Sequence, residues 1–146
     1  MPANLNLAGT EKFLDVAGLT KIVFTLGSGD TKGRGFDYDN DDDDHDFREH
    51  TPMFYSRGVL AEVVFSQGMI CIGASTLYWC EKIPSITVPE GVLTLNTAAF
   101  QFCKGMTSVS LPSTLQGVGD YCFGNAEALQ AVSVPNSVTY IGKFGF

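Results

Sequence analysis

Segment 37–49 holds the side chains that most directly suggest chemistry. It contains eight of the sixteen acidic residues of the chain, namely Asp37, Asp39, Asp41, Asp42, Asp43, Asp44, Asp46 and Glu49. Many twelve-residue calcium-binding loops begin with carboxylates at alternate positions. By this pattern the candidate calcium ligands are Asp37, Asp39, Asp41 and Asp43. The sixth and twelfth positions of such a loop require glycine and a bidentate glutamate, but Asp42 and Arg48 stand there. We therefore expect calcium binding to be weak or absent.

Other interpretations of segment 37–49 compete with calcium binding. A dense run of like charges is ordinarily a solvated, self-repelling loop. Such a run of carboxylates also imitates the charge of a nucleic-acid backbone. A third interpretation is a transition-metal site on a short helix. There, side chains four residues apart would form two pairs of ligands, drawn from His45, Asp46, Glu49 and His50. The flanking like charges oppose that helix, and the sequence alone leaves these alternatives open.

The remaining candidates for chemistry are thiols, and their spacing argues against catalysis. The four cysteines, which form neither a CxxC pair nor a zinc-finger spacing, are Cys71, Cys80, Cys103 and Cys122. No histidine lies near them in the sequence to activate a nucleophile. The sequence also lacks a phosphate-binding glycine loop, a recognisable Ser/His/Asp set and a catalytic carboxylate pair outside the acidic run. We therefore expect the thiols to be structural and Trp79 and the phenylalanines to lie in the core. We also expect the protein to bind no cofactor and to have no enzyme activity.

The charge distribution bounds the possible partners. Segment 37–49 carries a net charge of −7, the same as the whole chain of 146 residues, so the other residues sum to zero. No basic face is left to bind DNA or RNA by counterion release. No apolar run approaches the length of a membrane-spanning helix, which needs about 18 residues or more. The N-terminus lacks the charged start and apolar middle of a secretory signal, so the chain as given is not expected to be exported by itself.

A repeat with a period of about 23 residues organises the chain. Prolines mark it at Pro89, Pro112 and Pro135, and the same interval separates Phe100, Phe123 and Phe146. Leu19 precedes Leu60 by almost two periods, which indicates a unit lengthened by an insertion that includes the acidic segment. We predict a single domain of repeats across 1–146, with an acidic insertion at about 37–50. Its units are 1–18 (partial), 19–59, 60–82, 83–105, 106–128 and 129–146 (partial).

Within each unit, alternating apolar and polar residues predict a short strand that ends at the proline. The three clearest strands are Ile86-Thr87-Val88, Val109-Ser110-Leu111 and Val132-Ser133-Val134. One copy cannot bury its apolar face alone, whereas stacked copies can. The predicted fold is therefore α/β and β-rich, a right-handed solenoid with one short parallel strand per repeat and columns of identical apolar positions.

The repeat resembles a known family. Its consensus is Leu-x-x-Ile-x-Ile-Pro-x-x-Val-x-x-Ile-Gly-x-x-Ala-Phe-x-x-Cys, and unit 83–105 matches it best through Ile83, Ile86, Val88, Pro89, Val92, Leu95, Ala99, Phe100 and Cys103. This pattern resembles the BspA-like leucine-rich repeat, common in bacterial cell-surface proteins. Asn96 in place of glycine and Ala126 in place of cysteine depart from it. The resemblance implies a leucine-rich-repeat solenoid and a protein-binding or adhesion module without catalytic residues.

We therefore expect the outward side chains of the strands to carry the function. These side chains are small, hydroxylated and nearly uncharged. Such a surface suits extended contact with a protein or peptide. The predicted partner-binding residues are Thr20, Lys21, Val23, Glu62, Val64, Ser85, Thr87, Thr107, Ser108, Ser110, Gln130 and Ser133, flanked by Ala61, Pro84 and Ala131.

Two functional hypotheses follow. The first is a module of a longer cell-surface or secreted protein that recognises a host or partner protein, and we favour it. The second is a complete cytoplasmic protein, an acidic inhibitor or scaffold whose Asp-rich loop imitates nucleic acid. No polar capping units are apparent at either end of the array, which predicts self-association through the ends. Membrane insertion is not expected under either hypothesis.

Overall fold

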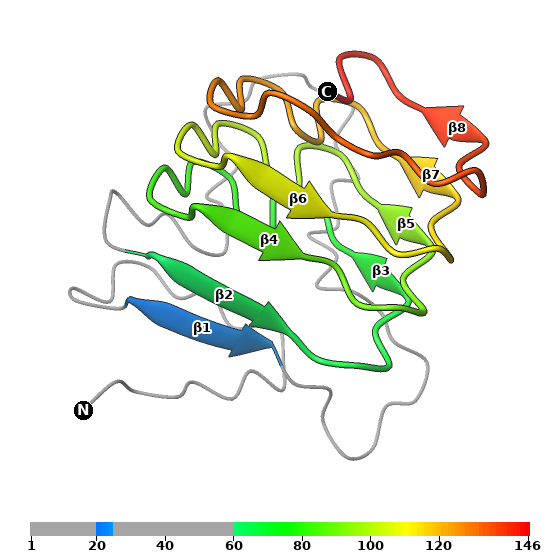
Figure 1. Cartoon of the computed structure of the whole chain (residues 1–146), viewed down its shortest axis with the longest axis horizontal. Coiled ribbons are helices and arrows are strands. Elements are labelled where there is room, and N and C mark those ends of the chain that lie inside the picture. Colours follow the sequence, from blue (N-terminus) through cyan, green and yellow to red (C-terminus); the bar gives the residue numbers. More distant parts are fainter. Residues whose placement is uncertain (1–19, 25–59) are drawn as a thin grey trace, which may run out of the picture.

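The computed structural model describes residues 20–24 and 60–146, which fold into parallel strands joined by turns (Figure 1). In chain order the strands are β1 (Lys21–Phe24), β2 (Glu62–Phe65), β3 (Cys71–Ile72), β4 (Ser85–Thr87), β5 (Thr94–Leu95), β6 (Ser108–Ser110), β7 (Gly117–Val118) and β8 (Tyr140–Ile141). No helix in this part of the chain is long and apolar enough to cross a bilayer. The described residues form an all-β coil.

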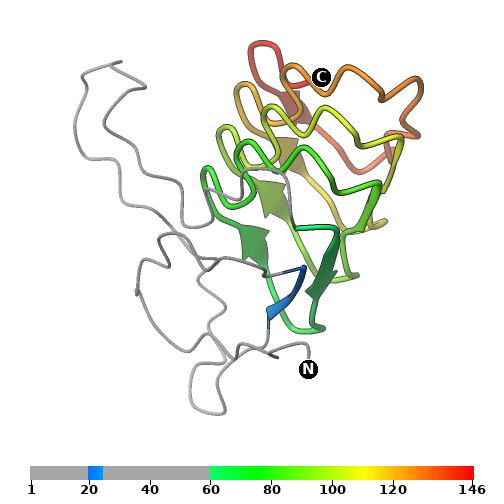
Figure 2. The same cartoon turned by 90° about the vertical axis from the view of Figure 1, so that its left-hand side faces the viewer.

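Two ladders of strands run along the stack. On one side β1 pairs with β2 and β4 pairs with β6; on the other the order is β3-β5-β7-β8. All pairs are parallel, and Ser85 opposite Ser108 and Leu95 opposite Val118 each join positions one repeat apart. Lys21 pairs with Glu62, a longer offset, which spans the insertion predicted from the sequence. Figure 2 shows successive coils stacked on one another, with the C-terminal repeat at one end.

The predicted solenoid of parallel strands is confirmed, and two of its details need correction. Each full repeat contributes a second short strand, such as β5 after β4, and the described residues contain no helix that would make the fold α/β. The turn at Pro89–Gly91, where Gly91 has a φ of 98°, redirects the chain into that second strand. Left-handed residues in the return segments then prevent helix formation.

The strand predicted at Val132-Ser133-Val134 is absent. Segment 129–135 has no assigned ladder partner, although it aligns in sequence with β4 and β6. Parallel strands in a solenoid are held together partly by burial of their alternate apolar residues. That burial declines along the stack at equivalent positions, from the buried Val88 through the half-buried Leu111 to the exposed Val134. The prediction was wrong because alternation of apolar and polar residues does not by itself provide a neighbouring repeat that buries the apolar side chains.

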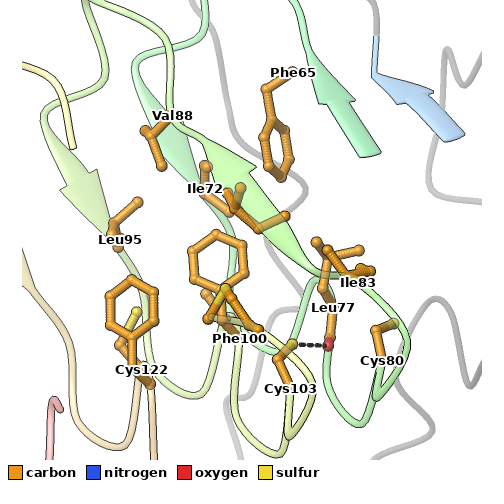
Figure 3. Close-up of a cluster of buried hydrophobic side chains, with 14 of the residues drawn as sticks. Phe65, Ile72, Leu77, Cys80, Ile83, Val88, Leu95, Phe100, Cys103 and Cys122 are labelled. Atoms are coloured by element: carbon orange, nitrogen blue, oxygen red, sulfur yellow. Dashed lines mark hydrogen bonds between the residues drawn. The ribbon is translucent and has the colours of Figure 1, made fainter. Parts of the chain in front are cut away.

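The core lies between the two ladders and repeats with the same interval (Figure 3). Phe100 stacks on Phe123 with ring centroids 5.2 Å apart, and Phe65 meets Phe100 edge-on at 6.3 Å. Ile72, Leu95 and other aliphatic residues fill the space around these rings. The predicted column of Phe100, Phe123 and Phe146 is therefore present; Phe100 and Phe123 are buried in it, whereas Phe146 is exposed.

Left-handed backbone recurs at equivalent positions of the return segments, at one position in four of them and at a second position in three. The first has φ between 53° and 56° at Ser75, Ala98, Tyr121 and Phe144; the second has φ between 58° and 65° at Trp79, Phe102 and Asn125. This conformation costs an L-residue about 1–2 kcal/mol. It persists here because cross-repeat hydrogen bonds fix the segment: the backbone N–H of Ala98 donates to Asp120 O at 2.9 Å, and that of Phe102 to Gly124 O at 2.9 Å.

Neighbouring alanines test this strain. Ala98→Gly removes a buried methyl group but relieves the left-handed conformation, so we expect a change in unfolding free energy within about 0.5 kcal/mol. Ala99→Gly, at a buried alanine without positive φ, removes a methyl group with no relief and should cost about 1.5–2 kcal/mol. Urea unfolding of both variants provides the comparison. Equal losses would contradict the strain argument.

Candidate functional site

The outward side chains of β1, β2, β4 and β6 form the candidate site, here called the strand face. Period-two alternation buries Ile86 and turns Ser85 and Thr87 outward, and β6 repeats the pattern with Ser108 and Ser110. The predicted outward residues lie on this face, all of them exposed except the half-buried Lys21 and Val23: Thr20, Lys21, Val23, Ala61, Glu62, Val64, Pro84, Ser85, Thr87, Thr107, Ser108 and Ser110. Gln130, Ala131 and Ser133 are also exposed, beyond β6 and outside any strand.

The strand face is polar but nearly free of net charge. Its two ionic residues neutralise each other, since Lys21 Nζ lies 2.7 Å from Glu62 Oε1 across the β1–β2 pair. Both side chains are substantially exposed, so the pair contributes at most about 1 kcal/mol to stability. Thr107 Oγ1 donates to Pro84 O at 3.1 Å, which ties a hydroxyl of one repeat to the backbone of the preceding one. The remaining hydroxyls are available to a partner's backbone groups.

A second cluster, on the return segments, was not singled out as a surface feature by the sequence. Trp79 stacks on Phe102 at 4.5 Å, and Tyr78 meets Phe102 edge-on at 5.5 Å. All three are half-buried, and Trp79 Nε1 donates to Glu81 Oε1 at 2.9 Å. We predicted from the sequence that these rings lie in the core. The contact between Trp79 and Phe102 could have been predicted from their separation by one repeat period.

The thiols lie mostly inside the core, as predicted. Cys80, Cys103 and Cys122 are buried, Cys71 is half-buried on β3, and none forms a disulfide. Cys103 Sγ donates to Leu77 O at 3.3 Å (Figure 3). Burial raises the pKa of the Cys103 thiol from 9.0 to about 12, against a smaller opposing effect of a backbone hydrogen bond from Cys80. Burial also raises the pKa of Cys122 far above its ordinary value. Neither thiol has the character of a nucleophile.

These thiols give a labelling prediction and a pH dependence. At about pH 8 a thiol reagent should modify only Cys71 in the folded protein and all four cysteines after denaturation. Unfolded thiols ionise near their ordinary pKa of 9.0, whereas folded Cys103 stays protonated to about 12. The stability that this difference contributes is complete below pH 9 and is lost as the pH rises from 9 towards 12. Rapid modification of all four thiols in the folded protein would contradict the buried column.

No metal site is found in the described part of the chain. Residues 20–24 and 60–146 contain no cluster of three or more His, Cys, Asp or Glu side chains able to hold an ion. The candidate calcium ligands Asp37, Asp39, Asp41 and Asp43 lie outside the described residues, as do His45 and His50. Weak calcium binding there stays a prediction. Calorimetric titration of calcium checks it, and a tight stoichiometric site would contradict it.

Comparison with known proteins places the chain. The family described as the BspA type leucine rich repeat region matches residues 50–146, with six copies. No curated protein shows significant similarity to the chain. Among solved structures, a leucine-rich repeat protein from Eubacterium ventriosum ATCC 27560 is 24% identical over 65% of this chain and 32% of its own length, with a TM-score of 0.47.

A leucine rich cell surface protein from Faecalibacterium prausnitzii A2-165 is also 24% identical, over 60% of this chain and 30% of its own, with a TM-score of 0.42. The chain thus spans about a third of the length of these two proteins. The family match covers more than half of the chain and coincides with the described repeats. The chain belongs to the BspA type leucine-rich repeat family.

Proposed function

We propose that the chain is a non-catalytic binding module that recognises a protein or an extended peptide through the strand face. The observation that supports this is the alignment of exposed hydroxyl and small side chains over four parallel strands, with the only two charges of those strands paired to each other. Leucine-rich-repeat modules generally bind proteins, in agreement with the family match.

Because the face carries no net charge, its partner contacts are expected to be hydrogen bonds and apolar contacts. Thr87 and Ser110 lie one repeat apart at equivalent ladder positions. A partner lying along the stack would contact both. Its affinity should change little with ionic strength, since little charge is neutralised on binding.

The test uses peptides selected from a random library on the intact chain. The variant carrying Thr87→Arg and Ser110→Arg places bulky charges at the centre of the face, and affinity should fall at least tenfold. Thr97→Arg, at an exposed threonine of a return segment, is the matched control and should bind as the parent does. Failure to select any peptide, or equal binding by all three proteins, would count against the strand face.

We further propose that the chain is part of a bacterial cell-surface protein with a role in adhesion or host recognition. The family match and the cell-surface description of the Faecalibacterium prausnitzii protein support this assignment. Intact cells that make the protein should bind an antibody raised against residues 60–146 without permeabilisation. Labelling only after permeabilisation would contradict a surface location.

A further inference from the structure

The ladder of the strand face is interrupted between β2 and β4. These two strands lie next to each other in the stack and are in contact (Figure 1). β1 pairs with β2 and β4 pairs with β6, but in the described part of the chain no pairing joins β2 to β4. The following strands of the same two repeats, β3 and β5, do pair. The interruption is therefore confined to the strand face, and the space between Glu62–Phe65 and Ser85–Thr87 is here called the β2–β4 seam.

Pro84 explains why the ladder stops at this place. The residue before a strand of this face donates its backbone N–H to the preceding coil: Ala61 N–H donates to Thr20 O at 2.9 Å. One repeat after Pro84, Thr107 N–H donates to Pro84 O at 2.9 Å. Pro84 stands at the equivalent position of its own repeat but has no N–H to donate to Ala61 O. Because proline in a sheet is ordinarily confined to an edge, Pro84 makes β4 an edge strand in the middle of the array.

The hydrogen bonds on the other side of β4 indicate which of its backbone groups point into the seam. Pro84 O accepts from the β6 side, and Val88 N–H donates to Ser110 O at 3.0 Å. In a parallel ladder the peptide groups of successive residues point alternately to the two neighbouring strands. The N–H and C=O groups of Ser85 and Thr87 therefore point towards β2, with which β4 has no ladder. Both residues are exposed, so these groups lie at the surface of the strand face.

The seam calls for an uncharged ligand with both a donor and an acceptor. By the same alternation Val63 directs its N–H and C=O towards β4, so the two sides of the seam offer the same kinds of group. The charge of Glu62 is already neutralised by Lys21, whose Nζ lies 2.7 Å from Glu62 Oε1. A carboxamide carries one acceptor oxygen and an NH₂ donor, as the missing ladder partner would. A carboxylate lacks the donor, and a guanidinium lacks the acceptor.

We propose that the β2–β4 seam binds the side-chain amide of an asparagine or glutamine in an extended partner peptide. The amide oxygen accepts from Thr87 N–H while the NH₂ group donates to Val63 O. A side chain fits this role better than an added strand, because β2 and β4 are in contact and leave no room for a whole strand between them. Val64, which is 39% exposed beside the seam, contacts the aliphatic part of the peptide. This inference rests on the proposed function and names the chemistry that the strand face recognises.

Amide hydrogen exchange of the intact chain tests whether the seam is open. Pro84→Ala installs the residue found at the equivalent Ala61 and restores the missing N–H, so β2 and β4 can pair. The amides of Ser85 and Thr87 should then exchange at least tenfold more slowly than in the parent. The hydrogen-bonded amide of Val88 is the reference and should exchange slowly in both proteins. Ser85 and Thr87 amides as protected as that of Val88 in the parent would overturn the open seam.

Binding is tested with peptides selected from a random library on the intact chain. Each asparagine or glutamine of a selected peptide is replaced in turn by aspartate or glutamate, which keeps the shape but removes the donor. One such replacement should lower affinity at least tenfold, and Pro84→Ala should weaken binding of the unchanged peptide to the same degree. Pro135→Ala, a half-buried proline that follows the aligned segment of the last repeat, is the matched control and should bind as the parent does. Circular dichroism confirms that both variants fold.

The outcomes separate this proposal from the proposed function. Selected peptides without asparagine or glutamine, or equal binding by the Pro84→Ala and Pro135→Ala chains, overturn the seam. If those peptides still lose affinity for the chain carrying Thr87→Arg and Ser110→Arg, the strand face remains the binding surface and only the seam is rejected. Failure to select any peptide overturns both.

Discussion

Phe100→Ala is expected to lower the free energy of unfolding by about 3–5 kcal/mol, the usual range for a fully buried aromatic residue. Phe100 is completely buried, stacks on Phe123 at 5.2 Å and meets Phe65 at 6.3 Å. The truncation leaves a cavity in the middle of the phenylalanine column. The surrounding backbone cannot collapse into it, because the hydrogen-bond ladders on both sides hold successive repeats at a fixed spacing.

Phe146→Ala is the matched control within the same column. Phe146 stacks on Phe123 from one side only and remains substantially exposed, so its loss should cost about 1 kcal/mol. Urea unfolding monitored by circular dichroism, at a concentration low enough to keep the chain monomeric, measures both variants. Similar losses for the two would show that burial between repeats is not the main source of stability.

Gly119→Ala has the second large expected effect, a loss of about 2–3 kcal/mol or failure to fold. A Cβ at this position would lie 2.7 Å from Thr97 N and 2.8 Å from Asn96 C, both in the backbone of the preceding repeat. These atoms lie directly after β5. They cannot move without breaking the hydrogen bond in which Gly119 N–H donates to Leu95 O at 2.7 Å. The glycine is required by close approach of two backbones.

Gly117→Ala, two residues away on β7, is the control. The nearest atom to an added Cβ is Thr94 Cγ2 at 3.8 Å, an ordinary contact with a side chain. Loss of glycine also reduces the entropy of the unfolded chain, so this variant should be neutral or more stable by up to about 1 kcal/mol. Thermal unfolding of the pair checks both expectations. A stable Gly119→Ala variant would mean that adjacent coils can separate without cost.

Spacing in the sequence predicted those features that depend on repetition. The separation of Phe100 and Phe123 by one repeat period predicted a column of rings, and the rings stack. Alternation at 85–87 predicted a buried Ile86 between two outward polar residues, and the structure has that pattern. Both features follow from side-chain period alone, because identical coils must place identical positions above one another.

Features that depend on a neighbour or on unusual backbone could not be predicted. β5 has two residues, too few to show alternation, and is defined only by its pairing with β3 and β7. Positive φ at Trp79 and Phe102 contradicts the usual preference for glycine or asparagine. The strand face is only partly predictable: residue type marks which side chains are outward, whereas the loss of pairing beyond β6 depends on tertiary packing.

The pairing of β1 with β2 shows that two strands can align in parallel even when the connection between them is longer than one repeat. The partners Lys21 and Glu62 lie much farther apart in the sequence than Ser85 and Ser108 of β4 and β6, yet both pairs are parallel. Closing a longer connection adds only a small entropic cost, because that cost grows with the logarithm of its length. Evolution can therefore lengthen one coil, and give it a new composition, while the rest of the array keeps its alignment. The same tolerance marks the connection between β1 and β2 as the place where a foreign peptide could be inserted by protein engineering.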